Sequence, residues 1–292
     1  MSETADIIIK STVGSWRYCI ESVTNPQMPS NYFYVLLLVS LICWTLEILF
    51  PWRKNQPLFR KDFWLDAFYM IFNFFLFYVV GYAALSDVGV HLFNNLLSSF
   101  GVENIVALHL QSSPKWLQYC MMFLVADFIH WNVHRLMHRI PFLWNFHKVH
   151  HSVQEMGFAA HLRFHWVESI LYKTIQYIPL SMIGFGLQDF FLMHIVTISI
   201  GHLNHSNLNL SYGPLKYILN NPKMHIWHHA KTLPKGQQAV NFGISLSVWD
   251  FIFGTSFVPS SGKDIPLGFP KVDSYPKSFV KQVIEPFKTK NN

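Results

Sequence analysis

Histidine is the residue type most able to do chemistry in this chain, because 14 of the 16 histidines fall between residues 130 and 229. Eight of them lie in three short strings, H-R-L-M-H, H-K-V-H-H and H-I-W-H-H. These strings contain His134 and His138, then His147, His150 and His151, then His225, His228 and His229. Positions i, i+3 and i+4 share one helical face, so each string predicts two or three imidazoles aimed at one point. Neutral imidazole is the commonest side-chain metal ligand.

The number of these residues limits the metal site that they can form. Eight imidazoles exceed the four ligands of a tetrahedral zinc site, so they suit two metal ions or one ion with a large coordination shell. The sequence contains neither H-E-x-x-H nor paired E-x-x-H motifs, which are typical of zinc proteases and of carboxylate-bridged di-iron bundles. The pattern therefore predicts a site dominated by nitrogen ligands.

Two residues just before the first string are candidates for supporting roles. Asp127 and His130 precede His134 by seven and four residues, which places them on the same helical face. We expect Asp127 to accept a hydrogen bond from an imidazole N–H, which would fix the tautomer of that ring. His130 is a candidate either for a further ligand or for a residue that supports one.

Three more candidates lie between the two H-x-x-H-H strings. His165 belongs to R-F-H-W-V-E, in which the spacing of Arg163 and Glu168 predicts a local ion pair. His202 and His205 follow a long apolar stretch that is expected to enter the membrane and return. They should therefore lie on the same side of the membrane as the three strings. We expect one of these two histidines to complete a coordination shell.

The composition is typical of a membrane protein. Of the 292 residues, 51% are hydrophobic and only 13% are charged, whereas a soluble domain has about 25% charged residues. The net charge is +6, and its excess in residues 231–292 predicts a tail facing an anionic membrane surface. No basic stripe interleaved with aromatic residues is present, so no nucleic-acid partner is expected. The three cysteines form no C-x-x-C motif, which argues against a thiolate metal site.

Four apolar segments predict membrane-spanning helices. They run from Asn31 to Phe50, from Phe63 to Leu85, and from Trp116 to Val133, and the stretch from Ser169 to Ile200 is broken by G-F-G-L-Q-D into a helical hairpin. The expected fold class is an all-α membrane protein. It would have about four transmembrane helices, including the hairpin, and a cytosolic His-rich helical cap. Nitrogen-bound iron beside such segments suggests O2 activation on a lipid substrate.

Charge placement predicts the orientation of these helices. Basic residues crowd the 51–61 loop, the first His strings and the C-terminal region, whereas residues 62–114 hold no Lys or Arg. By the positive-inside rule, the His strings therefore face the cytoplasm. We expect three parts: residues 1–115 with two transmembrane helices, a catalytic domain over residues 116–256, and a peripheral basic tail over residues 257–292.

The order and spacing of the strings resemble the fatty acid hydroxylase/sterol desaturase superfamily of membrane di-iron oxidases, which carries H-x-x-x-H followed by two H-x-x-H-H motifs. Flanking strings agree, among them D-F-I-H-W-N-V-H-R-L-M-H-R, L-R-F-H-W-V-E, H-S-N and N-F-G-I-S-L-S-V-W-D-F-I-F-G-T. The resemblance covers Trp116 to Thr255. One departure is His130, at a position where the family often has an aromatic residue.

This resemblance implies an O2-dependent oxidoreductase that hydroxylates or desaturates a membrane lipid at two iron ions. The implied metal ligands are His134, His138, His147, His150, His151, His225, His228 and His229, with His205 as the nearest match to the family's additional ligand and His202 as its competitor. The sequence shows no fused cytochrome b5 or flavin module, so electrons would come from a separate cytochrome b5-, ferredoxin- or flavoprotein-type donor. The spans do not identify the lipid.

Two other classes of protein place histidine clusters beside membrane helices. A metal transporter usually holds its ligands near the bilayer midplane and often has repeated halves, whereas here the strings flank the spans on one side. A zinc-dependent membrane hydrolase needs an open metal position and a general base. Both alternatives remain open from the sequence alone.

Overall fold

The computed structural model describes residues 3–28, 31–76, 87–101, 110–182, 185, 187–234, 237 and 239–288, and over these ranges the chain is helical, with three isolated β-bridges and no strand. The α-helices are α1 (Glu3–Thr24), α2 (Tyr32–Leu49), α3 (Phe63–Leu76), α5 (Asp87–Ser98), α6 (Lys115–Arg139), α7 (Pro141–His147), α8 (Trp166–Met182), α9 (Leu187–His205), α10 (Pro222–His228), α11 (Val248–Ile252) and α12 (Phe279–Ile284). The 3-10 helices are η2 (Leu110–Ser112), η3 (His150–Ser152), η4 (Phe158–Leu162), η5 (Gly213–Tyr217), η6 (Val272–Ser274) and η7 (Glu285–Phe287). The predicted all-helical fold is confirmed for the described residues.

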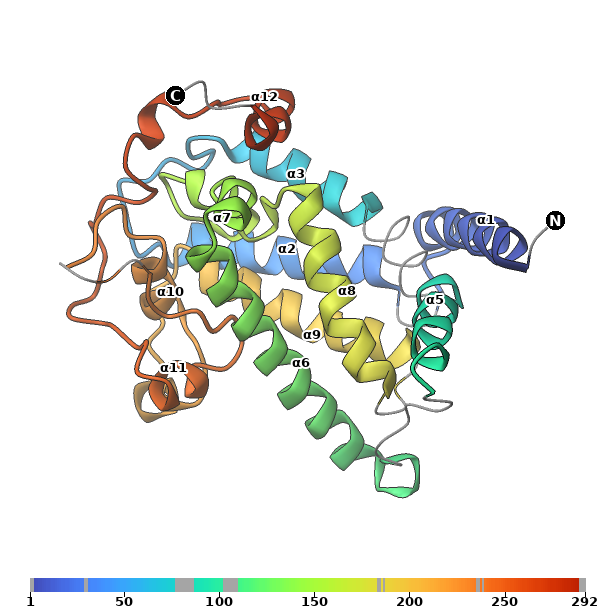
Figure 1. The fold of residues 1–292 in the computed structure, drawn as a ribbon. Coiled ribbons are helices and arrows are strands. Elements are labelled where there is room, and N and C mark those ends of the chain that lie inside the picture. The colour runs from blue at the N-terminus through green and yellow to red at the C-terminus, as the bar shows by residue number, and fades with distance from the viewer. Residues whose placement is uncertain are drawn as a thin grey trace.

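Helices α2, α3, α6, α8 and α9 form the body of the molecule (Figure 1). α9 packs against α2 and α6, and α6 also packs against α8. η4 contacts α2, α3 and α9, so a short loop element is buried among three long helices. The short helices α7 and α10 lie near the end of α6 that carries the first His string (Figure 1). The three strings are thereby brought to one end of the helical body.

Among the described residues, one helix, α2, is long and apolar enough to cross a membrane. Asn31 caps its N-terminus, because its side-chain oxygen accepts hydrogen bonds from the backbone N–H groups of Phe33 and Tyr34. Only 22% of this 18-residue helix is buried inside the protein. A buried core helix would be covered on most sides, so the apolar outer surface of α2 favours contact with lipid.

The other predicted spans coincide with helices over the described residues. α3 begins at Phe63 as predicted, and the rest of that segment, residues 77–85, lies outside the described part. α6 runs unbroken from Lys115 to Arg139, so the third predicted segment and the first His string share one helix. The fourth segment forms α8 and α9. α8 ends at Met182, just before the predicted break at residues 184–189, and α9 begins at Leu187, within it.

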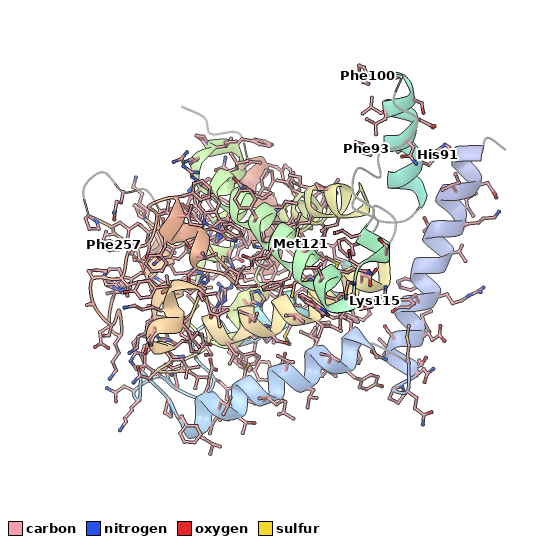
Figure 2. The ribbon with its side chains drawn as sticks, turned by 90° about the horizontal axis from the view of Figure 1, so that it is seen from below. His91, Phe93, Phe100, Lys115, Met121 and Phe257 are labelled. Atoms are coloured by element: carbon pink, nitrogen blue, oxygen red, sulfur yellow. The ribbon has the colours of Figure 1, made fainter. Side chains whose placement is uncertain are left out.

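The two ends of the chain pack differently. α1 and α5 contact each other at the edge of the molecule, and Figure 2 shows them standing beside the helical body. The C-terminal segment lies against the body instead, where Phe279 packs on Tyr69 of α3 with ring centroids 4.9 Å apart. Gln282 is buried, accepts a hydrogen bond from Tyr69 Oη and donates to Ser152 Oγ. Part of the segment expected as a peripheral tail therefore packs next to the first H-x-x-H-H string.

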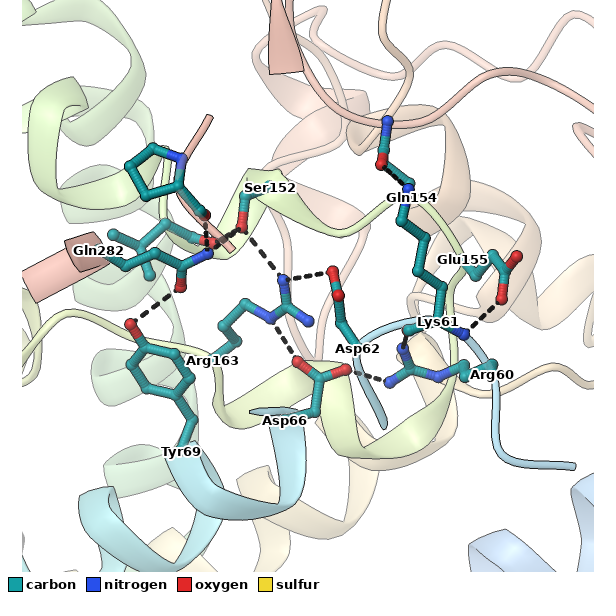
Figure 3. A network of polar contacts seen from close by, with 12 residues as sticks. Arg60, Lys61, Asp62, Asp66, Tyr69, Ser152, Gln154, Glu155, Arg163 and Gln282 are labelled. Atoms are coloured by element: carbon teal, nitrogen blue, oxygen red, sulfur yellow. Dashed lines mark hydrogen bonds and ion pairs between the residues drawn. The ribbon is translucent and has the colours of Figure 1, made fainter. Parts of the chain in front are cut away.

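A buried ion-pair network ties α3 to the segment between the first H-x-x-H-H string and α8 (Figure 3). Asp66 is fully buried and accepts hydrogen bonds from both Arg60 and Arg163. Arg163 also donates to Asp62 at 3.4 Å and to Ser152 Oγ at 3.2 Å. Because Ser152 directly follows His151, the network fixes the backbone that carries the string.

The local ion pair predicted between Arg163 and Glu168 is wrong. Arg163 bonds Asp66 because η4 packs directly against α3, which brings the Asp66 carboxylate to the guanidinium group. Glu168 lies in the first turn of α8 and accepts a hydrogen bond from His147 instead. Their closeness in the sequence favoured a pair between Arg163 and Glu168. In the folded protein, packing instead places Asp66 against Arg163 and His147 against Glu168.

Asp66→Asn should destabilise the protein by about 3–5 kcal/mol, because it leaves two buried guanidinium groups without their shared carboxylate. Asp62→Asn is the matched control, since Asp62 is 20% exposed and its loss should cost about 1 kcal/mol or less. Thermal unfolding of the detergent-purified variants, followed by tryptophan fluorescence, measures both effects. An Asp66→Asn variant that unfolds at the wild-type temperature would contradict this role for the network.

Candidate metal centre

Nine histidines form two adjacent groups. Cluster A consists of His134, His138, His147, His151 and His228, and cluster B consists of His150, His205, His225 and His229. Within each cluster the candidate ligand atoms all lie within 4.8 Å of one another, and every residue except His138 is buried. The two clusters touch, since the ring centroids of His151 and His229 are 4.3 Å apart.

Each H-x-x-H-H string aims two of its three imidazoles at one cluster, which agrees with the two or three predicted from the spacing, and its third imidazole at the other cluster. In the first string the i and i+4 residues join cluster A and the i+3 residue joins cluster B, and the second string shows the opposite division. Successive residues of a helical turn point about 100° apart. His150 and His151 therefore face different clusters, as do His228 and His229.

Three helix ends position these side chains. His134 and His138 lie in the last two turns of α6. His147 ends α7, and the chain then turns into η3, which begins at His150. His228 ends α10, a short helix that starts with Pro222 and is capped at its N-terminus by the side chain of Asn221. Short helices with defined ends let two adjacent histidines serve two separate clusters.

Hydrogen bonds at Nδ1 orient several rings so that Nε2 faces the interior of a cluster. Three rings donate from Nδ1 to a backbone carbonyl: His134 to Phe242 (2.7 Å), His228 to Val240 (2.8 Å) and His205 to Gly201 (2.7 Å). A carbonyl oxygen only accepts, so the proton of each neutral ring lies on Nδ1. The Nε2 atom of each ring then presents a lone pair.

These Nε2 atoms approach one another closely. In cluster A, His134 Nε2 and His147 Nε2 are 3.1 Å apart, and in cluster B, His205 Nε2 and His225 Nε2 are 2.9 Å apart. Two lone pairs at this distance repel each other unless a cation lies between them. With metal–nitrogen bonds of about 2.1 Å, two ligands at right angles lie about 3 Å apart. The spacing therefore fits a metal ion in each cluster.

Glu168 orients a histidine of cluster A, a role that the sequence analysis did not assign to it. Its Oε1 accepts a hydrogen bond from His147 Nδ1 at 2.7 Å, and both side chains are buried. Burial raises the pKa of Glu168 well above its usual value and lowers that of His147. A metal cation on His147 Nε2 would favour the ionised carboxylate. The sequence did contain a signal for this role. A metal-bound histidine commonly donates its other ring N–H to a carboxylate, and Glu168 is one of the few carboxylates near the predicted ligands in the sequence.

Cluster B has fewer hydrogen bonds around its rings. The Nδ1 atoms of His150, His225 and His229 are buried, and no partner for them lies within the described part of the chain. Burial lowers the pKa of His134 to about 4 and that of His205 to about 3, and it lowers the pKa of the other cluster histidines in the same direction. The rings are therefore neutral near pH 7, the form that binds metal.

The segment after α10 supplies the carbonyl groups that orient cluster A. Asp250 is buried and accepts hydrogen bonds from the backbone N–H groups of Phe242 (2.9 Å) and Gly243 (2.8 Å). A Cβ atom at Gly243 would overlap the backbone oxygen of Leu246, so this tight turn requires glycine. The turn holds the Phe242 carbonyl against His134.

Asp127 and His165 hold neighbouring segments in place. Asp127 accepts hydrogen bonds from Ser245 N (3.3 Å) and Trp249 Nε1 (3.0 Å), so the predicted imidazole partner is wrong. Asp127 lies two turns before His134 on α6 and faces the segment that leads into α11, so it bonds that segment and not an imidazole. His165 Nδ1 accepts from Val167 N at the start of α8, and its Nε2 lies 3.0 Å from a carbonyl of the C-terminal segment.

His130 and His202 lie near the clusters without joining them. The His130 ring stacks on Tyr172 with centroids 4.5 Å apart. His202 Nδ1 is 2.9 Å from His161 Nδ1, and His202 Nε2 is 3.1 Å from Ser40 Oγ. Of the two histidines expected to compete for the extra ligand position, His205 is the one that lies among the other Nε2 atoms.

A cavity of about 120 Å³ opens beside both clusters. His134 and His147 of cluster A and His150 and His225 of cluster B line it. Its other walls come from the helical body: Tyr32 of α2, Phe74 of α3, Ala126 of α6, Tyr172 of α8 and Met193 and Ile198 of α9. Most of the lining surface is apolar. An apolar compound entering between these helices would reach the histidines.

We expect protein purified anaerobically with iron to hold about two ions per chain, one in each cluster. His134→Ala should remove about one ion, and so should His225→Ala, because each change deletes an Nε2 from a different cluster. His202→Gln is the control and should retain both. Elemental analysis against protein concentration measures the ratio, and loss of both ions in each single variant would indicate one shared site instead.

Glu168→Gln should weaken metal binding in cluster A by about 10–100-fold, because the amide orients His147 less firmly and removes a negative charge. Binding in cluster B should change much less. Glu155→Gln, which alters an exposed carboxylate bonded to Lys61 N, is the matched control. Titration with a competing chelator separates the two sites, and wild-type affinity at both sites of Glu168→Gln would contradict the orienting role.

The sequence is similar to those of several lipid-oxidising enzymes. The chain is 33% identical to the ornithine lipid hydroxylase OlsE of Rhizobium tropici over 61% of its own length and 52% of that protein. It is 28% identical to the alkylglycerol monooxygenase of Xenopus tropicalis (80% and 47%) and 27% identical to methylsterol monooxygenase 1-1 of Arabidopsis thaliana (47% and 46%). The chain thus spans about half the length of these relatives, and no solved structure matches it significantly.

A family match covers the part of the chain that carries the site. Residues 119–255 match the sequence model of fatty acid hydroxylases. All nine histidines of clusters A and B fall inside these residues, as do Glu168 and Asp250. The resemblance seen in the spacing of the His strings is thereby confirmed: residues 119–255, the part of the chain that carries both clusters, match the fatty acid hydroxylase family.

Proposed function

We propose that this protein uses O2 to hydroxylate or desaturate a membrane lipid at two iron ions held by clusters A and B. One observation carries the proposal: two adjacent groups of converging Nε2 atoms line the same apolar cavity. The named relatives include a hydroxylase and two monooxygenases, which supports oxidation as the reaction class. Iron bound there would supply the reduction of O2 and the oxidant for an unactivated C–H bond.

The side chains of this chain would hold and shield that centre. The nine cluster histidines would be the ligands, with His205 in preference to His202. Glu168 and the Phe242 and Val240 carbonyls would keep three of the rings aimed inward. The apolar walls would exclude water and place one carbon of the lipid beside the clusters, and that placement would decide between an alcohol and an alkene.

The helical body would lie in a membrane, with the clusters on its cytoplasmic side. The apolar outer surface of α2 supports this placement, as do Trp64, Phe68 and Ile71, which are exposed on α3. The basic residues of the 51–61 loop and of the His strings favour the cytoplasmic orientation. We further propose four membrane-crossing helices, a catalytic domain over residues 116–256, and electron delivery by a separate redox protein.

Oxygen consumption should separate this function from metal transport or hydrolysis. Reduced, iron-loaded protein in lipid nanodiscs should consume O2 and produce an oxidised lipid, whereas His150→Ala should do neither, because it removes a cluster B nitrogen facing the cavity. His91→Ala is the control, as His91 lies on α5 outside both clusters. Mass spectrometry of the lipids under ¹⁸O2 identifies the product. A His150→Ala variant that folds and retains full O2-dependent turnover would overturn the proposal.

A further inference from the structure

The cavity contains a polar group of residues that the metal clusters do not use. Lys173 of α8, His194 of α9 and Tyr32 of α2 all line it. Lys173 Nζ donates to His194 Nδ1 at 2.8 Å, and His194 Nε2 lies 3.2 Å from Tyr32 Oη. Because Nδ1 of this ring accepts, its proton lies on Nε2, which donates to the tyrosine oxygen. Three helices thus contribute one connected chain of hydrogen bonds.

This polar group lies in an apolar setting. The Tyr32 ring stacks on Phe74 with centroids 5.6 Å apart, and Met193 and Ile198 line the same cavity. Lys173 and His194 both fall within the hairpin proposed to enter the membrane. Ionisable side chains are costly at such depth and usually mark a binding site or pathway. Lys173 keeps part of its surface accessible, and that surface borders the cavity.

The polar group is separated from the metal clusters by a definite length of helix. His194 precedes His205 by eleven residues on α9, which corresponds to roughly 16 Å along the axis. On α8, Lys173 follows Glu168 by five residues, or roughly 8 Å. A ligand bound at Lys173 would therefore present a different part of itself to the clusters. The cavity volume of about 120 Å³ has room for roughly four water-sized groups, enough for a short segment of one chain.

We propose that Lys173, His194 and Tyr32 form a subsite that binds an oxyanion of the lipid substrate, a carboxylate or a phosphate on a single hydrocarbon chain. The ammonium group would donate charge-assisted hydrogen bonds to the oxyanion. His194 holds the ammonium group in place, and the apolar walls bind the chain that leads to the clusters. The subsite thereby selects which carbon is oxidised. This inference rests on the proposed lipid oxidation but concerns binding alone.

Binding of defined probes tests the subsite without turnover. Full-length, iron-loaded protein in detergent is kept anaerobic and titrated with radiolabelled oleate, oleyl phosphate or oleyl alcohol. The wild type should bind one or both anionic probes at least about tenfold more tightly than the alcohol, and the two anionic arms distinguish a carboxylate from a phosphate. Equal affinity for all three probes would overturn the proposal.

Variants assign the effect to Lys173. Lys173→Met should weaken binding of the preferred anion about tenfold or more and change oleyl alcohol binding less than about threefold. Lys115→Met, which removes an exposed lysine from α6, is the matched control. Tyr32→Phe removes one hydroxyl group and should weaken anion binding by about threefold even if Lys173→Met fails to fold. A folded Lys173→Met or Tyr32→Phe variant with wild-type anion affinity would contradict the subsite.

The same measurements keep this inference separate from the proposed function. If the oxidation is wrong but the subsite is right, anion preference persists in protein that consumes no O2. If the subsite is wrong but the oxidation is right, lipid turnover proceeds while the anionic probes and the alcohol bind equally.

Discussion

The structure depends on one electrostatic constraint, which is the gathering of nine neutral imidazoles with their Nε2 lone pairs turned toward one another. Such an arrangement repels itself, since His205 Nε2 and His225 Nε2 are only 2.9 Å apart. A bound cation would convert this repulsion into attraction for every ring at once. Until it binds, the surrounding fold must hold the rings in place, and many of the buried polar contacts serve that purpose.

The contacts that support the clusters come from several separate segments of the chain. Carbonyl groups of the turn stabilised by Asp250 orient cluster A from one side, and Glu168 of α8 orients His147 from another. The Asp66 network fixes the backbone after the first H-x-x-H-H string through Arg163 and Ser152. Cluster B has fewer such contacts, with three Nδ1 atoms that find no partner among the described residues. The rings of cluster A are therefore held by more hydrogen bonds than those of cluster B.

The cavity is lined both by cluster histidines and by side chains of the long helices. Because α6, α8 and α9 line the cavity and also carry or adjoin cluster residues, a ligand between these helices would contact the metal site directly. The apolar walls and the Lys173–His194–Tyr32 group offer two kinds of contact to one molecule. Chain burial and oxyanion binding would together set the position of a lipid relative to the clusters.

The sequence alone predicted the helical fold class, the family and the histidines, because metal-ligand spacing and apolar runs are local patterns. His134 and His138 share a face of α6 as their spacing of four requires. Tertiary structure decided which histidines meet. The division of each H-x-x-H-H string between two clusters, and the separation of His205 from His202, depend on how α7, α9 and α10 pack. Packing likewise set the partners of Asp127, Arg163 and Glu168, because a buried charged group bonds the nearest complementary group in space. For Asp127 and Arg163 that group lies far away in the sequence. For Glu168 it is His147, which was not the partner expected from the sequence.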